Sequence, residues 1–102
     1  MAGHLTSWKS VDPEEGLDGV IRRRLKGSRA ELVRVEIPRG LVAPDHSHPH
    51  EQFVEVLQGS GTLTTPAGSK TFKAGDVFHF PAGTEHAASF DDDTVFLEIN
   101  LT

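Results

Sequence analysis

Hydrophobic and polar residues alternate along much of this chain with the two-residue period of a β-strand. The clearest stretch is Glu31–Ile37, where Val33, Val35 and Ile37 fall on one face and the residues between them are charged. Such alternation is typical of a strand that buries one face. No stretch repeats its apolar residues with the 3.6-residue period of a long amphipathic helix. The pattern therefore predicts an all-β protein.

Residues that favour turns, mainly glycine and proline, divide the chain into about eight short strands. The predicted strands cover residues 20–25, 31–37, 53–57, 62–65, 70–73, 77–80, 86–90 and 94–101. Short strands at regular spacing are typical of an antiparallel sandwich or a small barrel. Residues 1–19 contain glycine and proline without a clear period, so we expect an N-terminal arm at 1–19 and one β-barrel domain at 20–102.

The length and composition of the chain limit the number of domains and the kinds of partner that we expect. A chain of 102 residues forms one domain with a modest core. No apolar run approaches the roughly 20 residues of a membrane helix, and the formal charge of −5 argues against nucleic acid. The absence of cysteine fits a cytoplasmic protein. We therefore expect a cytoplasmic protein that binds neither membranes nor nucleic acids.

The richest group of potential metal ligands lies between residues 40 and 59. His46, His48, His50 and Gln52 occur within seven positions. Residues two apart in a strand point to the same face, so all four share the parity of Val54. If Val54 faces the interior, the strand pattern places these side chains near one mouth of the barrel.

A bound metal ion explains why several histidines would share one interior face. Buried imidazoles without partners are costly, and neutral imidazole is a common ligand of divalent ions. A further histidine, His86, lies in a second block of glycine and proline residues, and one ion held by both blocks unites them. Pro49 interrupts the pleat beside His50, so we expect His50 to be a pocket residue next to the metal. Nitrogen and oxygen ligands suit Mn, Fe, Co, Ni, Cu or Zn, and the sequence does not select among them.

The two blocks resemble the paired motifs of the cupin superfamily, G-x5-H-x-H-x3-E-x6-G and G-x5-P-x-G-x2-H-x3-N. The matching residues are Gly40, His46, His48 and Gly59 in the first motif, and Gly75, Pro81, Gly83 and His86 in the second. The resemblance implies a single-domain jelly-roll, or double-stranded β-helix. It also implies one divalent transition metal per chain, a small-molecule substrate and a homodimer.

The chain departs from the cupin motifs at two positions. Gln52 stands where the first motif has glutamate, and Phe90 stands where the second has asparagine. Gln52 is either a fourth metal ligand, through its side-chain oxygen, or a hydrogen-bonding neighbour of the ligands. A neutral ligand leaves the full charge on a dication, which makes the ion a stronger Lewis acid and a better anion binder.

Among cupins, three segments are similar to the small pectin-degradation proteins: Gly19–Arg23, His46–Gln52 and Val95–Glu98. Those proteins convert unsaturated uronates to open-chain keto acids. The similarity implies a metal-dependent, uronate isomerase or ring-opening activity on a small anionic or sugar-derived substrate. Glu98 and His50 are the candidate catalytic residues, and Glu98 is either a general base beside the metal or an exposed strand carboxylate.

Two other functions fit the same motifs. One is an O2-dependent cupin dioxygenase, and the other is a non-catalytic cupin that binds a small ligand. The basic cluster at residues 22–24, together with Lys26 and Arg29, also has two interpretations. It consists of solvated side chains on or beside an edge strand, or it is a rim that attracts anionic substrates.

Overall fold

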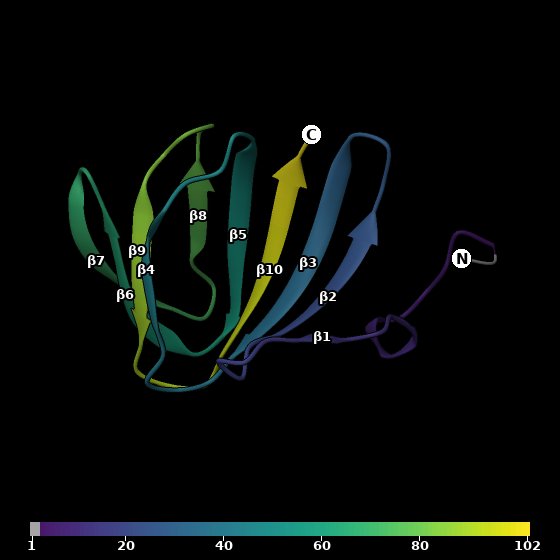
Figure 1. Cartoon of the computed structure of the whole chain (residues 1–102), viewed down its shortest axis with the longest axis horizontal. Helices are drawn as coiled ribbons and strands as arrows, with labels where there is room; N and C mark the ends of the chain where they lie inside the picture. Colours follow the sequence, from purple (N-terminus) through teal and green to yellow (C-terminus); the bar gives the residue numbers. More distant parts are fainter. Residues whose placement is uncertain (1–2) are drawn as a thin grey trace.

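The computed structural model describes residues 3–102, which fold into two facing antiparallel sheets (Figure 1). The elements are η1 (Trp8–Ser10), β1 (Glu14–Glu15), β2 (Ile21–Lys26), β3 (Ala30–Ile37), β4 (Val42–His46), β5 (Glu51–Gln58), β6 (Ser60–Thr65), β7 (Gly68–Lys73), β8 (Val77–Phe80), β9 (His86–Phe90) and β10 (Thr94–Leu101). One sheet has the order β1-β2-β3-β10-β5-β8 and the other β4-β9-β6-β7. The predicted all-β jelly-roll is confirmed.

All eight strands predicted from the alternation are present, and two strands were not predicted. One is β4, whose Pro44 and Asp45 read as turn residues in the sequence. β4 lies at the edge of its sheet, and its pairing with β9 shifts register between Ala43 and His46. Proline is tolerated at edges and irregularities because no ladder hydrogen bond is lost there. The strand therefore forms despite its sequence.

The other unpredicted strand is β1, inside the segment expected to be an arm. Glu14 and Glu15 pair with Arg22 and Ile21 of β2. Residues 3–10, which include η1, extend away from both sheets (Figure 1). The boundary between the arm and the barrel at residue 19 stays a prediction. No helix in the described part of the chain is long and apolar enough to cross a membrane.

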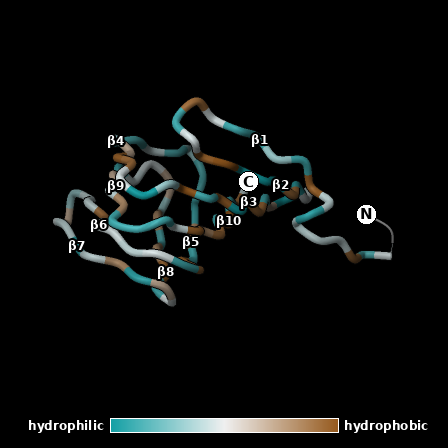
Figure 2. The backbone as a smooth tube through the Cα atoms, turned by 90° about the horizontal axis from the view of Figure 1, so that it is seen from below, coloured by the Kyte–Doolittle hydropathy of each residue, from teal (hydrophilic) through white to brown (hydrophobic). Residues whose placement is uncertain are grey.

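The core lies between the inner faces of the sheets. Hydrophobic and hydrophilic residues are interspersed along the strands (Figure 2), and the two-residue period directs the apolar ones inward. Val33, Val35 and Ile37 of β3 are at most 7% exposed, as the alternation predicts. Four aromatic rings form the centre of the core, with centroids 5.3–6.0 Å apart: Phe72, Phe78, Phe90 and Phe96. Because Phe72 and Phe90 belong to one sheet and the other two to its partner, this cluster joins the sheets.

β10 runs through the middle of the larger sheet and pairs with both β3 and β5. Its residues Thr94, Phe96 and Asn100 are buried on the inner face. Glu98 has the same parity and lines the space between the sheets. The structure therefore places Glu98 inside, not on the solvent-exposed outer face.

The position of Phe90 in the aromatic cluster explains why this chain lacks the asparagine of the second motif. Phe90 is 4% exposed, so Phe90→Asn would remove a packed ring and bury an amide among aromatic side chains. We expect this substitution to lower the free energy of unfolding by about 3–5 kcal/mol, measured by urea denaturation. Leu57→Asn, at a position that is 45% exposed, should change it by only about 0.5 kcal/mol. Equal losses for both variants would contradict this role of Phe90.

Candidate metal centre

Three imidazoles from the two histidine blocks meet at one end of the barrel. Ligand atoms of His46, His48 and His86 all lie within 4.8 Å of one another. His46 ends β4 and His86 begins β9, and the two residues are direct partners in the ladder between these strands. His48 follows in the loop after β4. The geometry therefore unites the two motifs, as the sequence predicted.

Backbone carbonyls fix the orientation of two of these rings. Nδ1 of His46 lies 2.9 Å from the carbonyl oxygen of Pro44, and Nδ1 of His86 lies 2.9 Å from that of Thr84. A carbonyl oxygen only accepts hydrogen bonds, so each Nδ1 carries the proton. Each Nε2 then has a free lone pair, which is the arrangement found at metal-bound histidines. The three residues fit a divalent transition metal ion.

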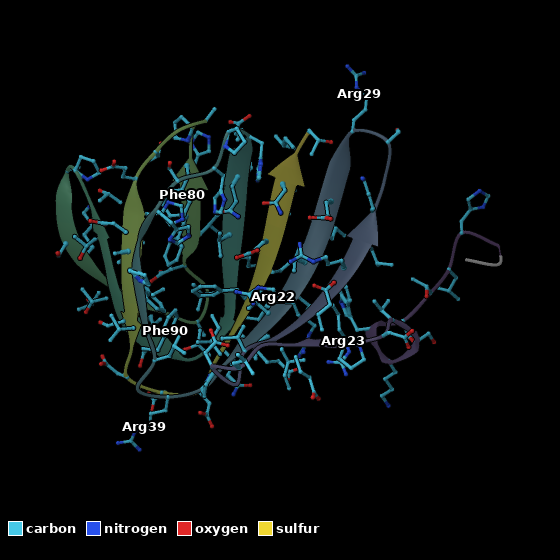
Figure 3. The ribbon with its side chains drawn as sticks, viewed as in Figure 1. Arg22, Arg23, Arg29, Arg39, Phe80 and Phe90 are labelled. Carbon is cyan, nitrogen blue, oxygen red and sulfur yellow. The ribbon has the colours of Figure 1, made fainter. Side chains whose placement is uncertain are left out.

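The loop that carries the second motif is tied to the first by a short backbone hydrogen bond. The Gly83 N–H donates to the carbonyl of His48 at 2.7 Å. Gly83 has a φ of +79°, a left-handed conformation that residues with a Cβ rarely adopt. His86 is held further by the ring of Phe80, which stacks on it at a centroid distance of 4.0 Å (Phe80 is labelled in Figure 3). The motif glycine and this stacking hold the ligand loop in place.

Gln52, the expected fourth ligand, is buried beside the imidazoles. It is 3% exposed and lines the same cavity as His46 and His86. Its Nε2 donates a 2.8 Å hydrogen bond to Oδ1 of Asn100, a residue that the sequence analysis did not identify. Because the amide nitrogen is committed to Asn100, the carbonyl oxygen is the atom left for a metal or a substrate. Coordination by Gln52 stays a prediction.

The shared parity of the four ligand candidates does not arise from one continuous strand. Residues 47–50 lie outside any strand, between β4 and β5, so the expected alternation holds only from Gln52 onward. Pro49, which cannot donate to a ladder, lies in this break. The imidazole triad is assembled by a strand end, a loop and the start of a second strand.

His50 lies against the triad without joining it. Its ring stacks on that of His48 with centroids 5.2 Å apart, and it is not among the residues that line the central cavity. Its Nε2 is buried and has no hydrogen-bond partner among the described residues. The catalytic role expected for His50 stays a prediction.

A cavity of about 350 Å³ runs between the sheets next to the triad. Its walls are mainly apolar side chains, and its polar residues are Asp18, Arg22, His46, Gln52, His86 and Glu98. A larger hollow of about 660 Å³, between β7 and β8, is lined by none of the triad residues. The smaller cavity therefore combines potential metal ligands, His46 and His86, with the carboxyl group of Glu98 and the guanidinium of Arg22.

Burial shifts the pKa values of ionisable groups in the triad and in this cavity. It lowers the pKa of His48, and repulsion from the neighbouring imidazoles lowers it further. Burial also lowers the pKa of His86, against the opposing effect of the Thr84 carbonyl. Both rings are thus neutral at neutral pH, as metal binding requires. Burial raises the pKa of Glu98, partly offset by Arg22, Arg24 and His46.

The family described as "Cupin domain" matches residues 33–100, about two thirds of the chain. Germin-like protein 5-1 from rice (Oryza sativa subsp. japonica) is 40% identical over 69 residues. That stretch is 62% of this chain but 31% of the rice protein, so the chain spans about a third of that relative.

Solved structures share the architecture over nearly the whole chain. An RmlC-like cupin from Shewanella frigidimarina has a TM-score of 0.88 at 21% identity, covering 96% of this chain and 89% of that one. KdgF from Halomonas sp. has a TM-score of 0.82 at 24% identity, covering 91% and 89%. At these identities the likeness shows a common jelly-roll fold alone.

The lowered pKa values of the histidines predict how metal affinity depends on pH. Protons compete with the metal for each ring, and His48 and His86 take up protons only below the ordinary value of about 6.5. Affinity for Zn²⁺, measured by competition with a chelating dye, should be flat from pH 8 to about 6.5. Below that range it should fall, by about tenfold per pH unit for each ring protonated. Affinity that stays constant down to pH 5 would contradict a histidine site.

Proposed function

The chain belongs to the cupin family, and we propose that it is a metal-dependent cupin that isomerises a small anionic, sugar-derived substrate. The observation that supports this most strongly is the position of the triad. Imidazoles with free Nε2 lone pairs adjoin an apolar cavity that also contains the buried carboxyl of Glu98.

The cavity holds the groups that a proton-transfer reaction needs. A divalent ion bound by His46, His48 and His86, with Gln52 as a fourth ligand, would polarise a substrate carbonyl or hydroxyl oxygen. Glu98 takes a proton from one position of the substrate and returns it to another. The net change is an isomerisation that needs no oxidant. A pKa raised by burial brings Glu98 closer to neutral pH, where a general base works best.

The neutral Gln52 favours an anionic substrate over a neutral one. With three imidazoles and one amide, a bound dication keeps its charge, whereas a glutamate ligand would reduce it. The similarity to the pectin-degradation cupins at Gly19–Arg23, His46–Gln52 and Val95–Glu98 supports unsaturated uronates as the substrate class. A cytoplasmic location, inferred from the absence of cysteine, is part of the same proposal.

The outer face of the larger sheet supports the homodimer. Four apolar residues are neighbours across its strands by register: Leu25, Leu32, Ile99 and Phe53. Each is only partly buried within one chain, so a second copy laid against this row would cover it. Sedimentation velocity distinguishes the proposed dimer from a monomer.

Glu98→Gln tests the proposed reaction. The metal-loaded wild type should consume an unsaturated uronate monosaccharide without O2, followed by loss of ultraviolet absorbance. The variant should retain metal and lose about 100- to 10,000-fold in kcat, because glutamine cannot carry the proton. Glu55→Gln, an exposed carboxylate on the outer face of the neighbouring strand β5, should leave kcat unchanged.

Other outcomes of this assay would overturn the proposal. O2 consumption with enolic or catechol-like substrates, without uronate turnover, would assign the protein to the dioxygenases. Saturable binding of either substrate panel without turnover would indicate a binding protein. Full kcat in Glu98→Gln would exclude Glu98 as the general base.

A further inference from the structure

Arg22 brings a positive charge into the cavity. In the ladder between β2 and β3 it pairs with Val35, a buried residue of the inner face. Successive strand residues point to opposite faces, so Arg22 faces the interior and Arg23 the outside (Figure 3). Arg22 lines the cavity together with His46, His86 and Glu98. The basic cluster at residues 22–24 is therefore not a uniformly solvated surface.

Arg22 differs from its neighbours because, among the residues that the structure describes, it has no anionic partner. The other arginines of this sheet region are paired with carboxylates at 2.9–3.4 Å: Arg23 and Arg34 with Glu36, and Arg24 with Glu14 and Glu31. Within residues 3–102, Arg22 makes no ion pair within 4.0 Å and no side-chain hydrogen bond. A guanidinium beside apolar walls favours an anion as its partner.

Glu98 does not fill this role. It shares the cavity with Arg22, but no nitrogen of Arg22 lies within ion-pair distance of its carboxyl oxygens. The two groups are close enough for Arg22 to stabilise the carboxylate form, yet burial dominates and raises the pKa of Glu98. The donors of the guanidinium are therefore available to a bound ligand.

We propose that Arg22 anchors the carboxylate of the substrate while another oxygen of the same molecule reaches the imidazole triad. This inference rests on the proposed function and names the residue that would set its substrate class. A guanidinium binds a carboxylate through two parallel hydrogen bonds, which fixes orientation as well as charge. The cavity of about 350 Å³ suits a ligand of monosaccharide size.

The charge of Arg22 favours an acidic sugar over a neutral one. A guanidinium matches one carboxylate through two parallel hydrogen bonds. Asp18 and Glu98 line the same cavity, and an ionised carboxyl opposes an added negative charge, whereas a dication bound at the triad would favour it. A sugar acid gives Arg22 a partner, and a neutral sugar leaves it without one.

Binding of galacturonate, with galactose as its neutral analogue, tests the anchor. Calorimetric titrations of metal-free and Zn²⁺-loaded protein should show that the wild type binds galacturonate more tightly than galactose. Arg22→Gln should weaken galacturonate binding by about 10- to 100-fold in both forms and leave galactose binding unchanged. Arg22→Lys should restore only part of the affinity, since lysine lacks the planar fork of donors.

Arg23→Gln is the matched control. It removes the same charge from the adjacent position, but from the outer face of β2, where Arg23 is paired with Glu36. It should bind galacturonate like the wild type, which separates a local contact from a change in overall charge. Thermal unfolding of all variants shows whether each is folded at the temperature of the titrations.

Three results would overturn the anchor. One is galacturonate affinity in Arg22→Gln equal to that of the wild type, another is an equal loss in Arg23→Gln, and the third is a wild type that does not distinguish galacturonate from galactose. The metal-free titrations separate this inference from the proposed function. Binding that depends on Arg22 without any turnover would retain the anchor and reject the isomerase. Uronate turnover by Arg22→Gln with a KM equal to that of the wild type would retain the isomerase and reject the anchor.

Discussion

The pairing of β4 with β9 is the constraint on which the rest of the site depends. It makes His46 and His86, which are far apart in the sequence, direct neighbours in one ladder. The hydrogen bond from the Gly83 N–H to the His48 carbonyl then joins the two loops that continue from these strands. Backbone hydrogen bonds thus gather the imidazoles, so a metal ion would find its ligands largely preorganised.

The same two-residue period that directs apolar side chains into the core also places the polar and charged side chains of the cavity. Along β10, Phe96 packs in the aromatic cluster, while Glu98 lies two residues further on the same inner face. On β2 and β5, Arg22 and Gln52 follow the same rule. Charged and polar side chains therefore enter an apolar interior at fixed places. Burial lowers the pKa values of His48 and His86 and raises the pKa of Glu98.

Much of this arrangement could be predicted because strand periodicity and motif spacing are local properties of the sequence. They located eight of the ten strands found within residues 3–102, the buried face of β3 and the three imidazoles that meet in space. The expectation that His46 to Gln52 share one face of a strand failed across residues 47–50. These residues form a loop between β4 and β5, and His50 lies within it, with its ring stacked on that of His48. β4 was missed because an edge strand tolerates Pro44, which a local rule reads as a turn.

Other features depend on contacts between distant residues, which periodicity does not reveal. The side-chain hydrogen bond between Gln52 and Asn100 joins β5 and β10, and no local pattern in the sequence predicts that these two residues are partners. Within residues 3–102 Arg22 has no anionic partner, because the nearby carboxylates pair with the other arginines. Phe90 was recognised only as a departure from the motif, and its packing against Phe72 and Phe96 supplies the reason.

The most direct test of this account is elemental analysis of the purified chain beside its His48→Ala and His86→Ala variants. If imidazoles from both motifs hold one ion, the wild type should contain one equivalent of a transition metal. Each variant should contain almost none, while its far-ultraviolet circular dichroism remains that of a β-protein, because the core consists of valine, isoleucine and phenylalanine. Full metal content in either folded variant, or none in the wild type after reconstitution, would contradict the shared site.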